Sequence, residues 1–470
     1  MPALCYVKDM KLKYDINDKP PISSAIILAF QQMLTILAAT IAVPMIVGNG
    51  LTPAATMFGA GVGTIVYQIM TKYKSPVFLG SSFSFLGSMM AAFAGGVSMT
   101  LGFLGLIIGA AFAGLVYVIL ALIVKKIGVK WISKAMPPVV IGPTVSVIGL
   151  SLAGNAISNM RTGNVKVLTA AGDLVPMADE NIAILCGIVT LFVTIICSVY
   201  GGRTLKFIPF LVGILAGYVF SAILTAIGNS MGMDALKILD FSLLINAIMP
   251  GGSISISSFI SLPDFVFIKA ISGFNELSLS YVITIFTAYV PVAFVGFAEH
   301  LADHKNLSSI IGKDLFEDPG LERTLLGDGL GSVAGAFFGG CPNTTYGESI
   351  ACVALTRNAA TITTFFAAVG CVLLSFVTPF VAFINSVPSC VMGGLCVVPY
   401  GFIAVSGLKM FKEIDLEDNR NIFVISVILI VGIGGMTLKF GAVTITEVAA
   451  ALIFGVIVNL LVGKQASSGQ

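Results

Sequence analysis

The chain has 470 residues, of which 57% are hydrophobic and only 10% are charged, whereas soluble proteins average about 25% charged residues. So few charges cannot cover the surface of a water-soluble protein of this size, which excludes that class and predicts a polytopic membrane protein. The net charge of +2 excludes a nucleic-acid binder, which needs a strongly basic surface.

Apolar runs predict fourteen membrane-spanning segments, because a helix needs about 20 residues to cross a bilayer. They lie near residues 23–48, 53–71, 76–95, 100–124, 134–154, 181–200, 206–228, 281–303, 324–341, 343–356, 360–386, 388–408, 420–437 and 442–463. Residues 1–21 are polar, and the apolar run after them is too long for the core of a cleavable signal peptide. We therefore expect an N-terminal tail over residues 1–21.

The positions of lysine and arginine fix the orientation of these segments, because cytoplasmic loops carry most of these residues. With the N-terminus in the cytoplasm, twenty of the 25 fall on the cytoplasmic side. The five on the other side are Arg161, Lys166, Lys237, Lys269 and Lys439. Both termini, including a tail over residues 465–470, are therefore expected in the cytoplasm, with the spans in the plasma membrane.

Two long loops are expected outside, at residues 155–180 and 229–280. Within the second, the moderately apolar stretch 263–272 could be an interfacial helix or a plain loop. This loop divides the spans seven and seven, and an odd number per half makes the halves run in opposite directions. The expected fold is therefore an all-α membrane protein of fourteen segments in 7+7 inverted repeats, the plan of secondary transporters.

The third segment of each half is interrupted by polar and β-favouring residues. The first reads Pro76-Val-Phe-Leu-Gly-Ser-Ser-Phe-Ser-Phe85, and the second reads Cys341-Pro-Asn-Thr-Thr-Tyr-Gly-Glu-Ser349. Extended backbone at membrane depth is tolerated only where protein or a cavity satisfies it. We therefore expect short extended segments that break spans 3 and 10, although a pair of surface turns would give the same pattern.

Acidic residues inside these spans point to a functional site, because they are costly there. Glu299 and Asp303 are four residues apart, so both carboxylates lie on one helical face. Glu348 follows the second break. Asp303 and His304 could instead mark the end of a helix at the membrane interface, and Asp328 could cap the start of one.

No metal or cofactor site is expected. Eight cysteines are scattered without a CxxC pair, and the chain has only two histidines. No HExxH pattern and no paired Cys/His pattern is present, so we expect no enzyme.

Carboxylates beside broken helices favour a neutral, planar ligand with N–H donors. Their oxygens would accept from those donors, while backbone N–H groups at the breaks would meet carbonyl groups of the ligand. A carboxylate at this depth can also carry a coupling proton. An anionic substrate fits poorly, since the lysines and arginines stand only at the ends of the spans or outside them, and none lies at membrane depth to receive it.

At these residues the sequence resembles the nucleobase–ascorbate transporter family, and its bacterial uracil/xanthine permeases in particular. The similarity runs from the first span to the twelfth. The matching stretches are Gln31-Gln32, Ala42-Val-Pro44, Gly80-Ser-Ser-Phe83, Ala298-Glu-His300, Gly312-Lys-Asp314, Asp318-Pro-Gly320, Pro342-Asn-Thr-Thr-Tyr-Gly-Glu348 and Val391-Met-Gly-Gly394.

The resemblance implies proton-coupled nucleobase uptake, and a homodimer. It implies a core domain at residues 22–124 and 281–386, a gate domain at 125–228 and 387–464, and a connection at 229–280. The residues implied to bind the base are Glu299, Glu348, Phe83, Gly347, Tyr400 and Ser349. Those implied or expected to couple the proton are Glu299, Asp303, His304 and Asp328.

The substrate signals are mixed. Aspartate at 303 looks like the purine-transporting branch, where the uracil permeases carry histidine, and Gln32 stands where many members have histidine. Glu348 matches the uracil branch, because xanthine transporters carry glutamine followed by asparagine, and here Ser349 follows. We favour uracil, with a proton- or sodium-coupled xanthine or guanine permease as the alternative.

Three other classes remain as alternatives to a carrier. A channel would need a continuous polar path, whereas the intramembrane charges cluster in one region. A membrane enzyme would need a nucleophile or metal cluster. A nucleobase-binding sensor would keep the binding residues without accumulating ligand, and saturable uptake separates the carrier from all three.

Overall fold

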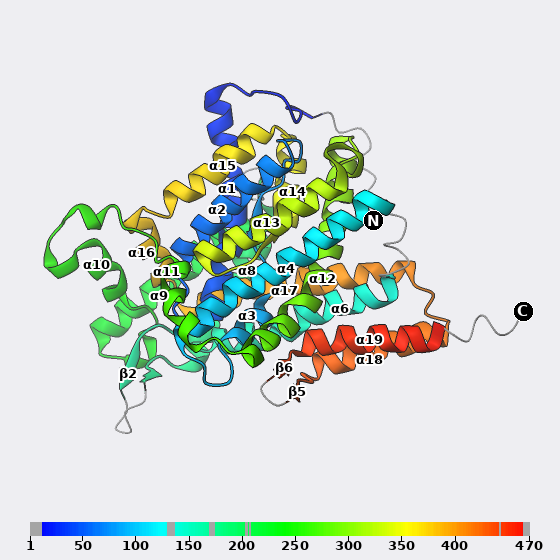
Figure 1. The fold of residues 1–470 in the computed structure, drawn as a ribbon. Helices are drawn as coiled ribbons and strands as arrows, with labels where there is room; N and C mark the ends of the chain where they lie inside the picture. The colour runs from blue at the N-terminus through cyan, green and yellow to red at the C-terminus, as the bar shows by residue number, and fades with distance from the viewer. Residues whose placement is uncertain are drawn as a thin grey trace, which may run out of the picture.

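The computed structural model describes residues 12–128, 137–168, 174–202, 205, 208–440 and 443–463, and it is built almost entirely from helices. Among these residues, seven helical segments are long and apolar enough to cross a membrane. They lie at Ile22–Val47, Met99–Ile127, Pro138–Met160, Glu180–Tyr200, Pro209–Met231, Leu279–Ile311 and Ser389–Lys412. Shorter helices pack between them (Figure 1). The expectation of an all-α polytopic membrane protein is confirmed.

The elements fall into two matching series. The first series is α1 (Ile22–Val47), α2 (Pro53–Met70), β1 (Leu79–Ser81) with α3 (Leu86–Ala92), α4 (Met99–Ile127), α6 (Pro138–Ser151) with α7 (Ala153–Met160), α8 (Glu180–Tyr200) and α9 (Pro209–Met231). The second is α12 (Leu279–Ile311), α13 (Leu321–Gly339), β4 (Asn343–Thr345) with α14 (Gly347–Thr356), α15 (Thr361–Leu374) with α16 (Thr378–Ser386), α17 (Ser389–Lys409), α18 (Asn419–Ile433) and α19 (Glu447–Gly463). Each of the fourteen expected segments thus coincides with a helix, a helix pair, or a strand followed by a helix.

The expected breaks in spans 3 and 10 are confirmed as two strands that pair with each other across the halves. β1 and β4 run antiparallel, with Leu79 opposite Thr345 and Ser81 opposite Asn343, and all their residues are buried. Each strand satisfies the backbone of the other, which is what permits extended chain in the middle of the bundle. Helices α3 and α14 then lead away from the crossing point.

Three boundaries differ from the sequence-based expectation. α12 continues past residue 303 to Ile311, because the helix ends only at Gly312, whose φ of +67° closes it. The segment expected at 360–386 is two helices, because residues 376 and 378 leave the helix to bond backbone groups of residues 259 and 261. α7 and the hairpin of β2 (Lys166–Leu168) and β3 (Leu174–Pro176) occupy much of the expected loop 155–180.

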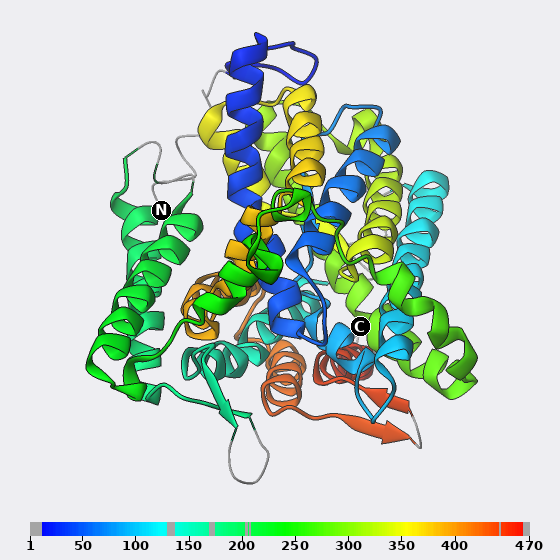
Figure 2. The ribbon, with the colours of Figure 1, turned by 90° about the vertical axis from the view of Figure 1, so that its left-hand side faces the viewer.

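The connection between the halves contains short helices. These are α10 (Phe241–Ile248) and α11 (Val266–Ala270), with 3₁₀ turns between them, and α11 falls inside the stretch 263–272 that was left open between helix and loop. A second hairpin, of β5 (Leu438–Phe440) and β6 (Val443–Ile445), precedes α19. Figure 2 shows both hairpins on the side of the molecule opposite to the residues before α1.

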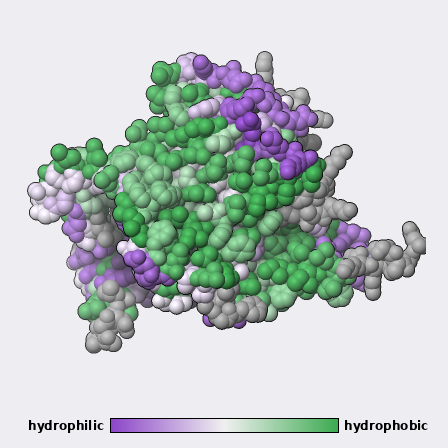
Figure 3. All heavy atoms as spheres, in the orientation of Figure 1, coloured by the Kyte–Doolittle hydropathy of each residue, from purple (hydrophilic) through white to green (hydrophobic). Residues whose placement is uncertain are grey.

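The outer surface of the bundle is apolar. Leu115, Ile119 and Leu122 of α4 are each about half exposed, as are Phe192 and Ile196 of α8. Figure 3 shows a broad hydrophobic face, with hydrophilic residues gathered toward its edges. Such a surface is stable against lipid and not against water, which fits a multi-pass membrane protein.

The N-terminal segment, residues 12–18, packs against α12, α14 and the loop before α15. Tyr14 bridges Asn358 in the loop between α14 and α15, and the buried Ile16 packs among Leu307 of α12 and Ile350 of α14. The Nζ atom of Lys313 lies 2.7 Å from an Asp15 carboxylate oxygen. This segment therefore connects α12, α14 and the loop before α15 at one end of the bundle.

We expect the Lys313→Ala variant to lose less than about 1 kcal/mol at pH 7, because both partners of this ion pair are nearly half exposed. The hydrogen bond from Lys313 holds the pKa of Asp15 below its usual value of 3.8. The pair therefore stabilises the fold above that pH, and its contribution is lost as the pH falls through the lowered pKa. Thermal unfolding in detergent should show a small difference between wild type and variant that is constant from neutral pH down to about pH 5 and vanishes in stronger acid. A difference that grows in acid would contradict this assignment.

Candidate functional site

Two successive turns of α12 carry four polar side chains: Glu299, His300, Asp303 and His304. Each acid is four residues from the other acid, and each histidine four from the other histidine, so the acids share one face and the histidines the neighbouring face. All four lie inside the 33-residue helix rather than at its end. The alternative that Asp303 and His304 mark a helix end is therefore wrong.

The acidic face meets the two strand breaks. The Ser84 hydroxyl, just after β1, donates to Glu299, with its oxygen 3.0 and 2.9 Å from the two carboxylate oxygens. The Thr345 hydroxyl in β4 donates to Asp303 at 2.8 Å. Each half of the chain thus supplies one hydroxyl from its break to one carboxylate of α12.

Glu348 and Gly347 begin α14 beside the same carboxylates. A Cβ atom on Gly347 would lie 3.9 Å from an Asp303 carboxylate oxygen, and Asp303 interacts electrostatically with both Glu299 and Glu348. All three acids are only half-buried, and Gly347 is exposed. The three carboxylates therefore lie near one another, beside the start of α14, where the first N–H groups of a helix have no partner within it.

Phe83 and Tyr400 meet edge to face, with ring centroids 5.8 Å apart, and both are buried. Phe83 comes from the break in the first half and Tyr400 from α17, so this contact joins the two groups of helices expected to form the core and the gate.

Ser349 lies apart from this face. Its hydroxyl oxygen accepts hydrogen bonds from Gln32 Nε2 at 2.8 Å and from the Phe78 backbone N–H at 3.0 Å, and the side chain is fully buried. Ser349 therefore ties α1 and the approach to β1 to α14, and holds the start of α14 in place behind Glu348.

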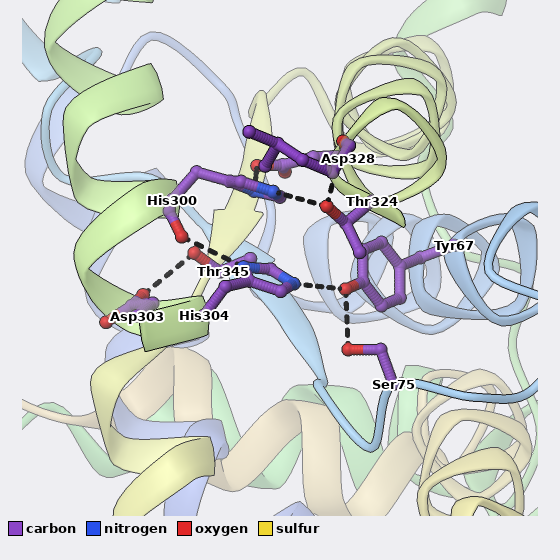
Figure 4. Close-up of polar contacts among 9 residues, drawn as sticks. Tyr67, Ser75, His300, Asp303, His304, Thr324, Asp328 and Thr345 are labelled. Atoms are coloured by element: carbon purple, nitrogen blue, oxygen red, sulfur yellow. Dashed lines mark hydrogen bonds and ion pairs between the residues drawn. The ribbon is translucent and has the colours of Figure 1, made fainter. Parts of the chain in front are cut away.

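The histidine face of α12 is a separate polar network, drawn in Figure 4. His300 Nδ1 lies 2.7 Å from an Asp328 carboxylate oxygen, and His300 Nε2 lies 3.0 Å from the Thr324 hydroxyl; both partners belong to α13. His304 Nε2 lies 2.7 Å from the Tyr67 hydroxyl of α2. The structure thus places Asp328 and His304 behind the carboxylates rather than among them.

Sequence reasoning identified the four carboxylates but not the hydroxyl groups that donate to Glu299 and Asp303. Ser84 and Thr345 stand within the two interrupted stretches, so a hydroxyl next to each break was the available signal. Tyr67 gave no signal, because it lies 237 residues from His304 in an apolar helix.

The acidic face can accept hydrogen bonds but donate few. Its carboxylates can accept from N–H donors, and the first N–H groups of α14 can meet a carbonyl oxygen. The arrangement is suited to a planar ring that carries both N–H and C=O groups on its edge. A proton bound to Glu299 or Asp303 would alter how the face accepts such hydrogen bonds.

Comparison with known proteins gives a consistent result. Residues 23–440 match the Permease family of the Xan_ur_permease type. The uracil permease of Bacillus caldolyticus is 36% identical over 454 residues, which cover 95% of this chain and 94% of that protein. The uracil permease of Bacillus subtilis is 34% identical, covering 96% and 95%, and that of Escherichia coli K12 is 33% identical, covering 95% and 93%.

Solved structures show the same architecture at low sequence identity. The transmembrane domain of the cyanobacterial bicarbonate transporter BicA superposes with a TM-score of 0.60 at 13% identity, covering 95% of this chain and 99% of that one. SLC26A9 superposes with a TM-score of 0.62 at 10% identity, covering 96% and 66%. At these identities the similarity shows the fold alone, which is the inverted-repeat plan expected from the span count.

Proposed function

The chain belongs to the xanthine/uracil Permease family, and from that premise we propose that it imports a nucleobase, uracil, across the plasma membrane by proton symport. The observation that carries the proposal is the convergence of Glu299, Asp303 and Glu348 at the crossing of β1 and β4. Uracil presents alternating N–H and C=O groups along one edge, which carboxylates and helix N–H groups complement. The named activity of its relatives supports the same substrate.

In this proposal Glu299 and Glu348 accept the N–H groups of the base, while Gly347 and Phe83 present backbone groups and Tyr400 closes the site. Phe83 and Tyr400 already touch across the boundary between the two helix groups. The core domain, residues 22–124 and 281–386, would move against the gate domain, residues 125–228 and 387–464. This motion exposes the site alternately to the two sides of the membrane.

Proton coupling in this scheme rests on Glu299 and Asp303, with Asp328 and His304 behind them. A proton taken up from the outside lets the acidic face receive the base without excess negative charge. Its release on the cytoplasmic side frees the base. Both termini are placed in the cytoplasm by the lysine and arginine distribution, and the working unit is a homodimer, as the family resemblance implies.

The deciding experiment is uptake of labelled uracil into proteoliposomes under an imposed inward proton gradient. Unlabelled uracil, xanthine and guanine serve as competitors, and a sodium gradient replaces the proton gradient in a parallel arm. Accumulation driven by protons and blocked only by uracil is the expected result. Competition by purines would move the assignment to a purine permease, saturable binding without accumulation to a sensor, and current without saturation to a channel.

Asp303 favours the second candidate, a purine permease, and one substitution tests its role. We expect Asp303→His to keep uracil uptake and to weaken competition by xanthine about tenfold, because the exchange removes one of three carboxylates at the site. Competition curves for both bases measure the ratio. Asp303→Asn, which keeps the size and a hydrogen-bond partner for Thr345, is the control. An unchanged ratio in Asp303→His would show that this position does not set selectivity.

A further inference from the structure

The second histidine of α12 is held by a chain of hydroxyl groups that the proposed transport mechanism does not use. His304 is buried, with Nδ1 2.9 Å from the His300 carbonyl oxygen and Nε2 2.7 Å from the Tyr67 hydroxyl. The Tyr67 hydroxyl in turn lies 2.8 Å from the Ser75 hydroxyl. Figure 4 shows the Tyr67 hydroxyl of α2 between His304 of α12 and Ser75 in the stretch before β1.

The protons available to His304, Tyr67 and Ser75 determine which directions the hydrogen bonds between them can take. A carbonyl oxygen only accepts, so His304 Nδ1 must carry a proton, and Nε2 accepts in the neutral ring and donates in the charged ring. The Tyr67 hydroxyl has one proton and two neighbours. When His304 is charged, Nε2 donates to Tyr67 and Tyr67 donates to Ser75, which is the direction the Tyr67–Ser75 geometry has here. When His304 is neutral, Ser75 can donate to Tyr67 and Tyr67 to Nε2.

We propose that Tyr67 and Ser75 are positioning residues for proton coupling: their hydroxyl chain reverses direction and so keeps His304 fully hydrogen-bonded in both of its protonation states. A buried polar group that loses a partner destabilises the state in which the partner is lost. The reversible chain removes that penalty from both states. This inference rests on the proposed proton symport, and it adds to that mechanism Tyr67 and Ser75, which lie outside the acidic face of α12.

The titratable and polar groups around His304 determine how readily its ring takes up a proton. On α12 itself, the His300 ring stacks on the His304 ring with centroids 4.0 Å apart, and Asp303 precedes His304. From α13, Asp328 bonds His300 at Nδ1 and the Thr324 hydroxyl bonds it at Nε2. Tyr67 faces His304 from α2, the Tyr117 ring of α4 contacts His300, and Glu348 of α14 acts through Asp303.

The surroundings of Ser75 connect the chain to one end of the bundle. Gln68 Nε2 donates to the Ser75 carbonyl oxygen, which fixes the short stretch between α2 and β1. The neighbouring Lys74 is exposed and paired with Asp318. A change in the direction of the hydroxyl chain is thus linked to the segment that enters β1.

A direct test uses the fact that the chain has only two histidines, His300 and His304. Protein labelled with ¹⁵N-histidine, with any affinity tag removed, gives two pairs of ring signals in a nuclear magnetic resonance spectrum. We expect Tyr67→Phe to change the Nε2 signal of one histidine and to displace its titration by about one pH unit or more. Identical titrations in wild type and variant, or a wild-type histidine that never titrates, would overturn the inference.

A second test separates positioning from folding. Tyr67→Phe should lower proton-driven accumulation of uracil about tenfold, the effect of one hydrogen bond to a charged group. Uracil exchange at equal concentrations on both sides, which needs no net proton movement, should stay within about twofold. Ser75→Ala should act in the same direction, and Ser75→Thr should restore accumulation.

Tyr73→Phe is the matched control, since Tyr73 is exposed and its ring contact with Phe365 survives the change. Equal losses of accumulation and exchange in Tyr67→Phe would show a merely structural role and overturn the inference. Wild-type protein that takes up no uracil would overturn the proposed function instead. The histidine spectra would then still decide whether the hydroxyl chain responds to protonation.

Discussion

Glu299→Gln should abolish uphill accumulation of uracil. The glutamine side chain keeps the size of the glutamate and can still accept from the Ser84 hydroxyl, but it cannot take up and release a proton. A hydrogen bond to a charged group contributes about 1.5–3 kcal/mol, so uracil affinity should fall by about ten- to a hundredfold as well. Uptake with and without a proton gradient, combined with equilibrium binding, measures the two losses separately.

Glu317→Gln is the control for this substitution, because Glu317 is exposed and lies beyond the end of α12. It should transport at the wild-type rate. Ser84→Ala removes only the hydroxyl donor and should weaken accumulation in part, since the carboxylate remains. Full accumulation by Glu299→Gln under a proton gradient would remove this residue from the coupling mechanism and leave Asp303 as the candidate.

The broken spans could be predicted from sequence because the physics is local. A proline followed by hydroxyl, glycine and β-favouring residues disfavours a helix in either half, and β1 and β4 lie where those residues lie. The pairing of the two strands was not predictable in the same way. It joins residues that are far apart in the sequence, such as Leu79 and Thr345, and nothing in either stretch specifies the other.

The end of α12, in contrast, was predicted at the wrong residue. Hydropathy falls after Asp303, so the expected span stopped there, yet the helix continues for two more turns to Gly312. Membrane depth and helix length are different properties, and only the second is set by the helix-ending glycine. The consequence is functional, because Asp303 and His304 are mid-helix residues held by neighbours on α2 and β4.

In the site, too, some residues could be predicted from the sequence and others could not. Intramembrane carboxylates stand out against an apolar sequence, so Glu299, Asp303, Asp328 and Glu348 were visible at once. The hydroxyl partners of Glu299 and Asp303 were not, since serine and threonine are common in membrane helices and often bond only the backbone of their own helix. Asp328 lies on the histidine side of α12 because Asp328 and Thr324 of α13 bond the two ring nitrogens of His300.

The position of α13 depends on a crossing of glycines between α2 and α13, the second and ninth spans, and this crossing leads to the largest expected effect on folding. A Cβ atom on Gly59 of α2 would lie 2.5 Å from the Gly335 carbonyl oxygen of α13, and one on Gly63 would lie 2.6 Å from the Gly331 carbonyl oxygen. Both helices therefore carry a pair of glycines four residues apart that lets the backbones touch. Asn343 of β4 fills the remaining space and donates from Nδ2 to the Gly59 carbonyl oxygen.

Gly63→Ala should therefore destabilise the protein by about 2–3 kcal/mol, because the added methyl group meets backbone that cannot move without separating the helices. The larger Gly63→Leu should yield no folded protein. Gly154→Ala is the matched control, since no atom lies within 4 Å of a Cβ at that position of α7 and alanine favours a helix over glycine. Thermal unfolding in detergent should show a lower midpoint for Gly63→Ala and an equal or higher one for Gly154→Ala. Because the same crossing holds Asn343, Gly63→Ala should also weaken uracil binding, whereas a variant with wild-type stability and binding would mean that α2 and α13 do not meet as closely as these glycines require.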